Sequence, residues 1–238
     1  MKTANNLPNI IMVSFDALRK DFLSIYNDSG VSIPLFEKAF KNGIRFKSAI
    51  TSGNWTIPSH ASLFSGMEPQ NHRLLNWFES LSKKCPTLFS EAKRNGYRTA
   101  FLSSDGLQPI ISDQKDQLDI LGKTSDPRSS EIKSDDEPWF VFWHFLNTHA
   151  PYGIRAPREA DPKFLDMDLK NKDMNYVREM VCSGRVEEIK TAIQVNLHSA
   201  AKKVEALLNR LGTNSIVVLL SDHGEDWRPH FPFHCSFE

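Results

Sequence analysis

Four short apolar runs are spaced along the chain and predict buried β-strands. They are NIIMVSF at 9–15, YRTAFLS at 97–103, WFVFWHF at 139–145 and SIVVLLS at 215–221. Each run is nearly all apolar and rich in Val, Ile or aromatic residues. This composition is typical of central strands in a parallel sheet that is covered on both faces.

Helical patterns lie between these runs. PLFEKAFKNG at 34–43 and PTLFSEAKRNG at 86–96 both end in a glycine, and the second begins with a proline. The longest pattern, from about 186 to 211, repeats apolar residues three or four positions apart. Strands that alternate with helices predict an α/β fold, in which a mostly parallel sheet with right-handed crossovers is sandwiched by helices.

The domain organisation follows from the spacing of these elements. We expect residues 1–238 to form a single α/β domain, with the stretch 104–137, rich in Ser, Asp, Lys and Pro, as a flexible loop excursion. The sequence ends only a short way beyond its most apolar strand. The expected domain is therefore truncated at its C-terminus, so that a sheet edge and part of a site are missing.

Charge and cysteine content exclude several classes of protein. Acidic and basic residues balance at 29 each, which argues against a nucleic-acid groove or a polybasic membrane surface. The N-terminus lacks the long apolar stretch of a signal peptide, and no run approaches membrane-spanning length. The three cysteines are widely spaced without a CxxC pair, which fits a reducing compartment. These features predict a cytoplasmic protein with no nucleic-acid or membrane partner.

Polar residues follow the predicted strands at their carboxyl ends, where open α/β sheets bind ligands. The first strand ends at Asp16, the third leads into His144 and His149, and the fourth leads into Asp222 and His223. Parallel strands bring these residues to one rim of the sheet.

Taken singly, some of these residues have simpler roles. Asp16 suits the cap of a following helix, His144 suits a hydrogen-bonded core position, and His149 suits an ordinary loop. The adjacent Asp222 and His223 are more informative, because a divalent cation would explain why both lie at a strand end. Their oxygen and nitrogen donors suit zinc or manganese better than calcium, which prefers oxygen alone.

The stretch NWTIPSHASLFSG at 54–66 combines a hydroxyl, a proline and an imidazole just ahead of an apolar helix. Pro58 favours a helix start and Ser59 suits its cap, so that the first turn would face an anion. Near a cation, the Thr56 hydroxyl becomes a nucleophile, and His60 could hold that hydroxyl or a substrate oxygen. The alternative is a buried helix cap in which Trp55 serves only packing.

The sequence resembles the sulfatase branch of the alkaline phosphatase superfamily. TIPSHASLFSG matches the sulfatase signature Cys/Ser-x-Pro-Ser-Arg-Ala-x-Leu-(Leu/Phe)-(Thr/Ser)-Gly at nearly every place. The segments NIIMVSFDALRKDFLSIYN, GYRTAFLSS, WFVFWHFLNTHAPY and IVVLLSDHGED follow the family order, so the resemblance covers nearly the whole chain.

The resemblance implies a role for each candidate residue. The implied ligands of one divalent metal ion are Asp16, Thr56, Asp222 and His223, with Thr56 also the nucleophile. Three further residues have implied catalytic roles. His149, in a His-x-Pro element, resembles a histidine that contacts the transferred group or protonates the leaving oxygen. His60 stands where sulfatases carry an arginine that orients the nucleophile, and His234 resembles a basic residue near the leaving group.

Departures from the family pattern shape the expected reaction. Sulfatases oxidise Cys or Ser at the Thr56 position to an aldehyde, which threonine cannot form because its carbinol carbon bears a methyl group. Threonine is the usual nucleophile in the family's phosphodiesterases and phospho-group transferases. In place of the second aspartate of the sulfatase pair stands Ala17, and His223 replaces the usual asparagine. Fewer oxygen ligands favour manganese or zinc over calcium.

We therefore predict a metal-dependent hydrolase or transferase that cleaves phosphate diester, phosphate ester or phosphonate ester bonds. A small anionic ester would be its substrate, and Thr56 would carry the covalent intermediate. Two alternatives stay open at this point. One is a sulfuric ester hydrolase, and the other is a non-catalytic, truncated family member that binds an anion or a partner.

Overall fold

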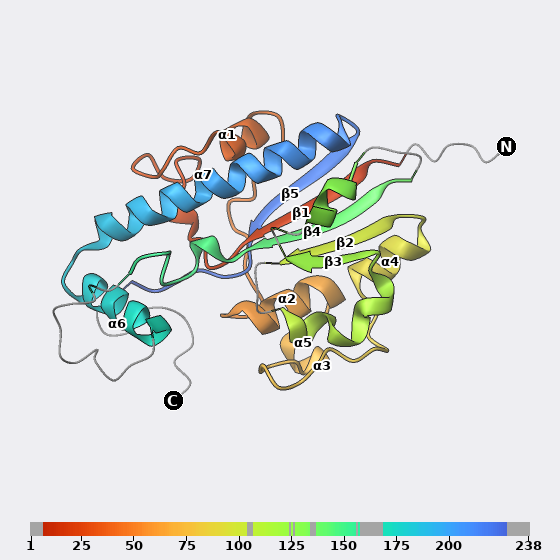
Figure 1. Ribbon diagram of the computed structural model, residues 1–238, viewed down its shortest axis with the longest axis horizontal. Helices are drawn as coiled ribbons and strands as arrows, with labels where there is room; N and C mark the ends of the chain where they lie inside the picture. Colours follow the sequence, from red (N-terminus) through yellow and green to blue (C-terminus); the bar gives the residue numbers. More distant parts are fainter. Residues whose placement is uncertain are drawn as a thin grey trace.

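The computed structural model describes residues 7–103, 107–123, 125, 127–133, 137–155, 157 and 169–227. Within these residues, five parallel strands form one sheet in the order β3-β2-β4-β1-β5 (Figure 1). The strands are β1 (Asn9–Phe15), β2 (Arg98–Ser103), β3 (Ile120–Lys123), β4 (Trp139–Phe145) and β5 (Ser215–Ser221). The predicted α/β fold with a parallel sheet is confirmed.

Helices cover both faces of the sheet (Figure 1). One layer contains α1 (Pro34–Lys41), α6 (Leu169–Cys182) and α7 (Val186–Leu211). The other contains α2 (Thr56–Ser65), α3 (Pro69–His72), α4 (Leu88–Arg94) and α5 (Gln108–Ile111). Single 3-10 turns are η1 (Lys20–Phe22), η2 (Ser112–Gln117), η3 (Pro127–Glu131) and η4 (Leu146–Thr148).

Strand β4 shows why the apolar runs are continuous rather than alternating. Val141 and Trp143 face the α7 layer, whereas Phe140 and Phe142 face the α2 layer. All seven residues of β4 are buried because helices cover both sides. The centre of the sheet is therefore a rigid platform, and its carboxyl ends hold the polar residues at fixed positions.

Strand β5 differs from the other long strands. It was expected to be a buried central strand, but within the described residues it pairs only with β1 and forms an edge of the sheet. Its residues are half-buried, and the Ile216 side chain is 51% exposed. An apolar run alone cannot distinguish an edge strand from a central one, because strand order depends on contacts remote in sequence.

The segment 104–137 was expected to be a loop, but its described residues contain α5 and the strand β3. Residues 120–123 of β3 pair in parallel with 100–103 of β2. The four residues ILGK are too short and too mixed in polarity to produce a strand pattern in the sequence. Pairing with β2 therefore decides the conformation of this segment.

Helix α2 begins earlier than the sequence suggested. Its first residue is Thr56, and the extended Trp55 precedes it, so Ser59 lies inside the first turn and does not cap the helix. Instead the Ser59 hydroxyl donates a hydrogen bond to the Asp222 carbonyl oxygen at 2.5 Å. Trp55 is buried and packs against Trp77, with ring centroids 5.3 Å apart. The hydrogen bond fixes the start of α2 against the end of β5, and the ring contact packs it against the segment that follows α3.

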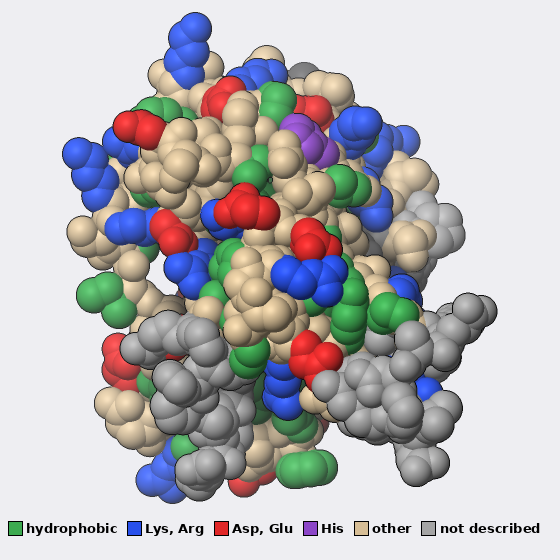
Figure 2. All heavy atoms as spheres, turned by 90° about the vertical axis from the view of Figure 1, so that its left-hand side faces the viewer, with side chains coloured by type: hydrophobic (Ala, Val, Ile, Leu, Met, Phe, Trp, Pro, Cys, Tyr) green, Lys and Arg blue, Asp and Glu red, His purple; other side chains and the backbone are tan. Residues whose placement is uncertain are grey.

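The surface carries charges of both signs. On the face shown in Figure 2, the described acidic and basic side chains are interspersed, as the balance of 29 and 29 implies. Among the described residues, no helix combines the length and the apolar character that crossing a membrane requires.

Candidate functional site

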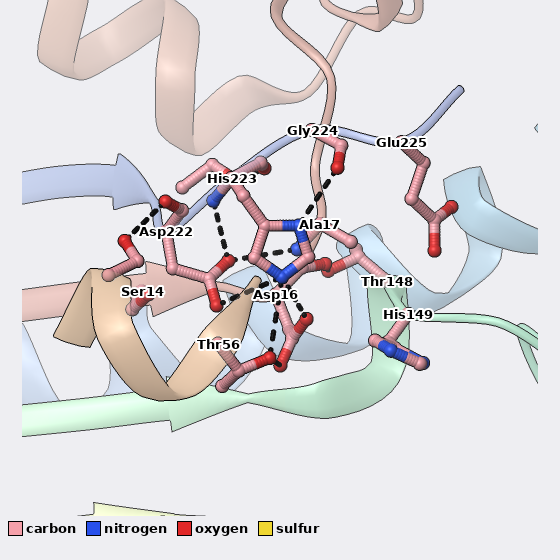
Figure 3. A network of polar contacts seen from close by, with 12 residues as sticks. Ser14, Asp16, Ala17, Thr56, Thr148, His149, Asp222, His223, Gly224 and Glu225 are labelled. Carbon is pink, nitrogen blue, oxygen red and sulfur yellow. Dashed lines mark hydrogen bonds and ion pairs between the residues drawn. The ribbon is translucent and has the colours of Figure 1, made fainter. Parts of the chain in front are cut away.

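Three elements bring four polar side chains together at one rim of the sheet (Figure 3). Asp16 directly follows β1, and Asp222 and His223 directly follow β5, its parallel neighbour. Thr56 is the first residue of α2, which packs beside these strand ends. All four residues are at least nine-tenths buried. Three segments that lie 40 to 207 positions apart in sequence therefore share one small volume.

The Thr56 hydroxyl lies at the centre of this group. It donates a hydrogen bond to Asp16 Oδ2 at 3.3 Å, and its oxygen lies 3.3 Å from His223 Nε2. The side chain is 5% exposed, so the hydroxyl is largely shielded from solvent. The alternative of a buried helix cap formed by Ser59 does not apply, because no side-chain cap bond is formed at the start of α2.

One oxygen of Asp222 anchors the loop that follows β1. Asp222 Oδ1 accepts hydrogen bonds from the backbone N–H of Ala17 at 3.0 Å and of His223 at 2.9 Å. Ala17 has a φ of 58°, a left-handed conformation that costs a non-glycine residue about 1 kcal/mol or more. The Asp222 hydrogen bond helps to hold this strained backbone in place.

The second oxygen of each carboxylate has no such partner. Asp16 Oδ1 and Asp222 Oδ2 are buried and accept no hydrogen bond within the part of the chain that the structure describes. They lie 3.5 Å and 3.4 Å from His223 Nε2. A buried carboxylate oxygen without a partner is costly, and a cation is one of the few groups that would satisfy two of them at once.

The spacing of the four ligand atoms fits a small divalent cation. Zinc bonds of about 2.0–2.2 Å to N and O in a tetrahedral site place neighbouring ligand atoms about 3.3–3.6 Å apart. The distances from His223 Nε2 to Thr56 Oγ1, Asp16 Oδ1 and Asp222 Oδ2 are 3.3, 3.5 and 3.4 Å. Asp16, Asp222 and His223 thus form a ligand group of suitable spacing.

The tautomer of His223 suits the same role. Its Nδ1 lies 2.8 Å from the Gly224 carbonyl oxygen, which can only accept a hydrogen bond. Nδ1 therefore carries the proton in the neutral ring, and the lone pair is on Nε2, which faces the carboxylates. A backbone carbonyl that orients a ligand histidine in this way is a common feature of metal sites.

Electrostatics within the group favour a positive charge between the carboxylates. Burial raises the pKa of Asp16, but the hydrogen bond with His144 and the close contact with His223 outweigh it and hold this pKa well below its usual range. Burial and the neighbouring Asp16 charge raise the pKa of Asp222 to about 6. Burial lowers the pKa of His223, but the close contact with Asp16 and both carboxylate charges raise it to about 9. A proton on His223 thus does in part what a metal ion would do.

The remaining predicted residues lie outside this group. His149 follows η4, is half-buried, and lies beside the cluster in Figure 3, with its Nδ1 donating to the Ala150 carbonyl oxygen at 2.5 Å. The His60 ring is fully buried, and its two nitrogens contact the Thr56 carbonyl oxygen and the Ser14 hydroxyl at 2.9 and 3.0 Å. His60 therefore supports the start of α2, and its catalytic role stays a prediction. His234 lies outside the described residues.

Sequence reasoning assigned no functional role to two residues that contact Asp16. His144 Nε2 lies 3.0 Å from Asp16 Oδ2, although the expectation of a hydrogen-bonded core position for His144 is itself met. Thr148 donates to the Asp16 carbonyl oxygen at 2.6 Å. The available signal was that His144 is the single polar residue in the run 139–145, where a buried imidazole needs a partner.

Comparisons with known proteins agree on the family. The family model described as Sulfatase matches residues 8–236. Among curated proteins, the chain is 23% identical over 281 residues to the Delta 4,5-hexuronate-2-O-sulfatase of Bacteroides thetaiotaomicron. This match covers 95% of the chain and 58% of that protein, so the chain spans less than two thirds of the relative's length.

Solved structures show the same fold. A 2-O GAG sulfatase superposes with a TM-score of 0.66 at 17% identity, covering 98% of this chain and 61% of the other. The phosphonate monoester hydrolase of Agrobacterium radiobacter gives a TM-score of 0.65 at 15% identity, with coverage of 92% and 63%. At such low identity the likeness establishes the fold, which both sulfate and phosphonate enzymes use.

Proposed function

Because the chain belongs to the sulfatase family, we propose that it cleaves phosphate or phosphonate ester bonds by attack of the Thr56 hydroxyl. The observation that carries this proposal is the position of Thr56 Oγ1, which lies 3.3 Å from both Asp16 Oδ2 and His223 Nε2. A hydroxyl that served only packing would not need two buried ionisable partners. Asp16, Thr56, Asp222 and His223 would hold one divalent ion, with zinc or manganese favoured over calcium.

When bound, such an ion would lower the pKa of the hydroxyl and polarise a phosphoryl oxygen. The chain's own groups account for the remaining steps. Asp16 Oδ2 accepts the hydrogen bond from Thr56 and orients its oxygen for attack. Thr56 Oγ1 gives up its proton to solvent and bonds to phosphorus as the bond to the leaving oxygen breaks, and His149 donates a proton to that oxygen. Water, or an acceptor alcohol, then attacks phosphorus and returns a proton to His149 as the bond between phosphorus and Thr56 Oγ1 breaks.

The threonine itself favours phosphorus over sulfur as the centre attacked. A threonine side chain cannot become the aldehyde by which sulfatases release sulfate, whereas a threonyl phosphate is a competent intermediate for an attack at phosphorus. Sulfate ester hydrolysis is the second candidate, supported by the family match and by the curated relative that is a sulfatase.

A direct comparison of substrates tests the proposal. Aryl sulfate, bis-aryl phosphate and aryl phosphonate would be assayed with the same aryl leaving group after addition of zinc or manganese. We expect the phosphorus esters to turn over at least about tenfold faster than the sulfate, and a reversed preference would establish the sulfatase alternative. With a slow phosphonate, mass spectrometry should find the phosphonyl group on Thr56, and the Thr56→Ala variant should lack it.

A further inference from the structure

Directly beneath the rim, one row of polar side chains crosses three strands. Ser14 of β1 and Ser103 of β2 both lie opposite His144 of β4 in the strand register. On the same face, the preceding row includes Phe142 and Phe101, which belong to the aromatic core beneath α2. His144 is 0% exposed. Burial of an imidazole next to aromatic rings is unfavourable unless its nitrogens are hydrogen-bonded.

Both nitrogens of His144 have partners. Nε2 lies 3.0 Å from Asp16 Oδ2, and Nδ1 lies 3.0 Å from the Ser103 hydroxyl. The ionised Asp16 carboxylate can only accept, so Nε2 carries the hydrogen and donates it. Nδ1 is then the acceptor, and the Ser103 hydroxyl donates to it. Ser103 thereby selects the tautomer in which His144 can bond Asp16.

This contact fixes the rotation of the Asp16 carboxylate. With Oδ2 accepting from His144 and from Thr56, the other oxygen, Oδ1, is turned towards His223 Nε2 at 3.5 Å. Without His144, the carboxylate could rotate about its Cβ–Cγ bond and lose this arrangement. Carboxylates that bind metal ions are commonly held by such hydrogen bonds, whose loss weakens metal affinity about 10- to 100-fold.

We propose that His144, with its tautomer set by Ser103, is a positioning residue that turns Asp16 Oδ1 towards the metal ion. The proposal rests on the proposed metal-binding role of Asp16. It differs from a second metal site, although the ligand atoms of His60, His144 and Asp222 also lie within 4.8 Å of one another. Both rings already use both nitrogens on protein groups, so an ion there would displace hydrogen bonds.

The test is a calorimetric titration of the metal-free protein with zinc chloride alone, which gives the zinc affinity. The thermal midpoint of each metal-free variant is measured in parallel. We expect one zinc ion per chain in the wild type. His144→Leu should weaken zinc affinity about 10- to 100-fold. His144→Gln, whose amide N–H can still reach Asp16, should restore most of that affinity. Ser103→Ala should weaken it by a smaller factor, about 3- to 10-fold, because the ring can then adopt the other tautomer.

Ser62→Ala is the matched control. The Ser62 hydroxyl also bonds a histidine, His72 Nε2 at 3.1 Å, but this pair lies in α2 and α3 away from Asp16. The control should leave zinc affinity within about twofold of the wild type while losing a comparable hydrogen bond. If His144→Leu does not fold, the comparison of Ser103→Ala with Ser62→Ala decides the question.

Each result separates the positioning role from the proposed function. Wild-type zinc affinity in both His144→Leu and Ser103→Ala, together with lost affinity in Asp222→Asn, would overturn the positioning role and retain the metal site. Two zinc ions per chain would overturn it in favour of a second ion at the histidines. If the wild type binds neither zinc nor manganese, the metal site and the positioning role both fail.

Discussion

The rim of the sheet and the row directly beneath it contain similar polar residues, but they differ in how completely their side-chain atoms are hydrogen-bonded. At the rim, Asp16 Oδ1 and Asp222 Oδ2 accept no hydrogen bond within the described part of the chain. In the row below, His144 and the His60 ring that packs against it from α2 have partners on all four ring nitrogens. Buried polar atoms without hydrogen bonds indicate a site for a ligand from solution. Side chains whose polar atoms are all hydrogen-bonded to the protein instead hold neighbouring residues in place. Residue type alone would not separate the two regions.

The largest effect should come from removing the proposed nucleophile at the rim. Thr56→Ala is expected to lower turnover of phosphorus esters by roughly 10³-fold or more, because the hydroxyl that lies between Asp16 and His223 is lost. Thr56→Ser keeps the hydroxyl and should retain activity within about tenfold. Both would be measured as kcat/KM on the preferred ester. Equal activity of Thr56→Ala and the wild type would contradict the proposal that Thr56 at the rim is the nucleophile.

The next effect concerns a carboxylate that is destabilising without a metal. Asp222→Asn should weaken zinc affinity at least about 100-fold, more than the loss of a residue that only supports a ligand. Since burial and the Asp16 charge raise the Asp222 pKa to about 6, the metal-free variant should be more stable than the wild type above pH 6, by roughly 1–3 kcal/mol. Calorimetry and denaturant unfolding measure the two quantities. A variant that is weaker in both would contradict this account.

The third effect is a pH dependence at the rim. In the metal-free protein, the His223 pKa of about 9 exceeds the unfolded value of 6.5. The folded state therefore holds an extra proton between these values, and its stability falls as pH rises from 6.5 to 9, by up to about 3 kcal/mol. Unfolding free energies of the wild type and of His223→Asn would be compared across this range. The difference in unfolding free energy between the wild type and His223→Asn should shrink as pH rises. Saturating zinc should change how this difference depends on pH.

The smallest effect concerns His60, beneath the rim, and its contribution to stability changes with pH in the opposite direction. Burial, followed by the His144 charge, lowers the pKa of His60 to about 3. The unfolded chain then binds a proton that the folded chain does not, so stability is lost as pH falls below 6.5, by about 2 kcal/mol at pH 5. His60→Asn keeps a donor for the Thr56 carbonyl and should lack this component of acid sensitivity. Parallel pH curves for the two proteins would show that His60 does not stay neutral.

Much of this arrangement was predictable because it depends on local patterns. The four long strands and the rim positions of Asp16, Asp222 and His223 follow from apolar runs and from the polar residues at their ends. The strand β3 was missed because its pattern is short, and the edge position of β5 depends on strand order. Ser59 was wrongly expected to cap α2, because Pro58 fits inside the first helical turn as well as at its start.

The supporting residues were harder to find for a different reason. The contacts of the buried His60 and His144 depend on how α2 packs on the sheet and on the strand register. Neither can be inferred from one segment of the sequence. The metal's identity, the catalytic roles of His60, His149 and His234, and the cytoplasmic location stay predictions. Each depends on chemistry or surroundings beyond the packing of the described residues.

The half-exposed strand β5 has a practical consequence for handling the isolated chain. Within the described residues, β5 is an apolar strand at an unpaired sheet edge, which can offer its backbone to an extended segment, including β5 of another molecule. Concentrated preparations should therefore tend to associate through this strand. Ile216→Lys, at a side chain that is 51% exposed and at the end of β5 opposite the candidate site, should reduce this association.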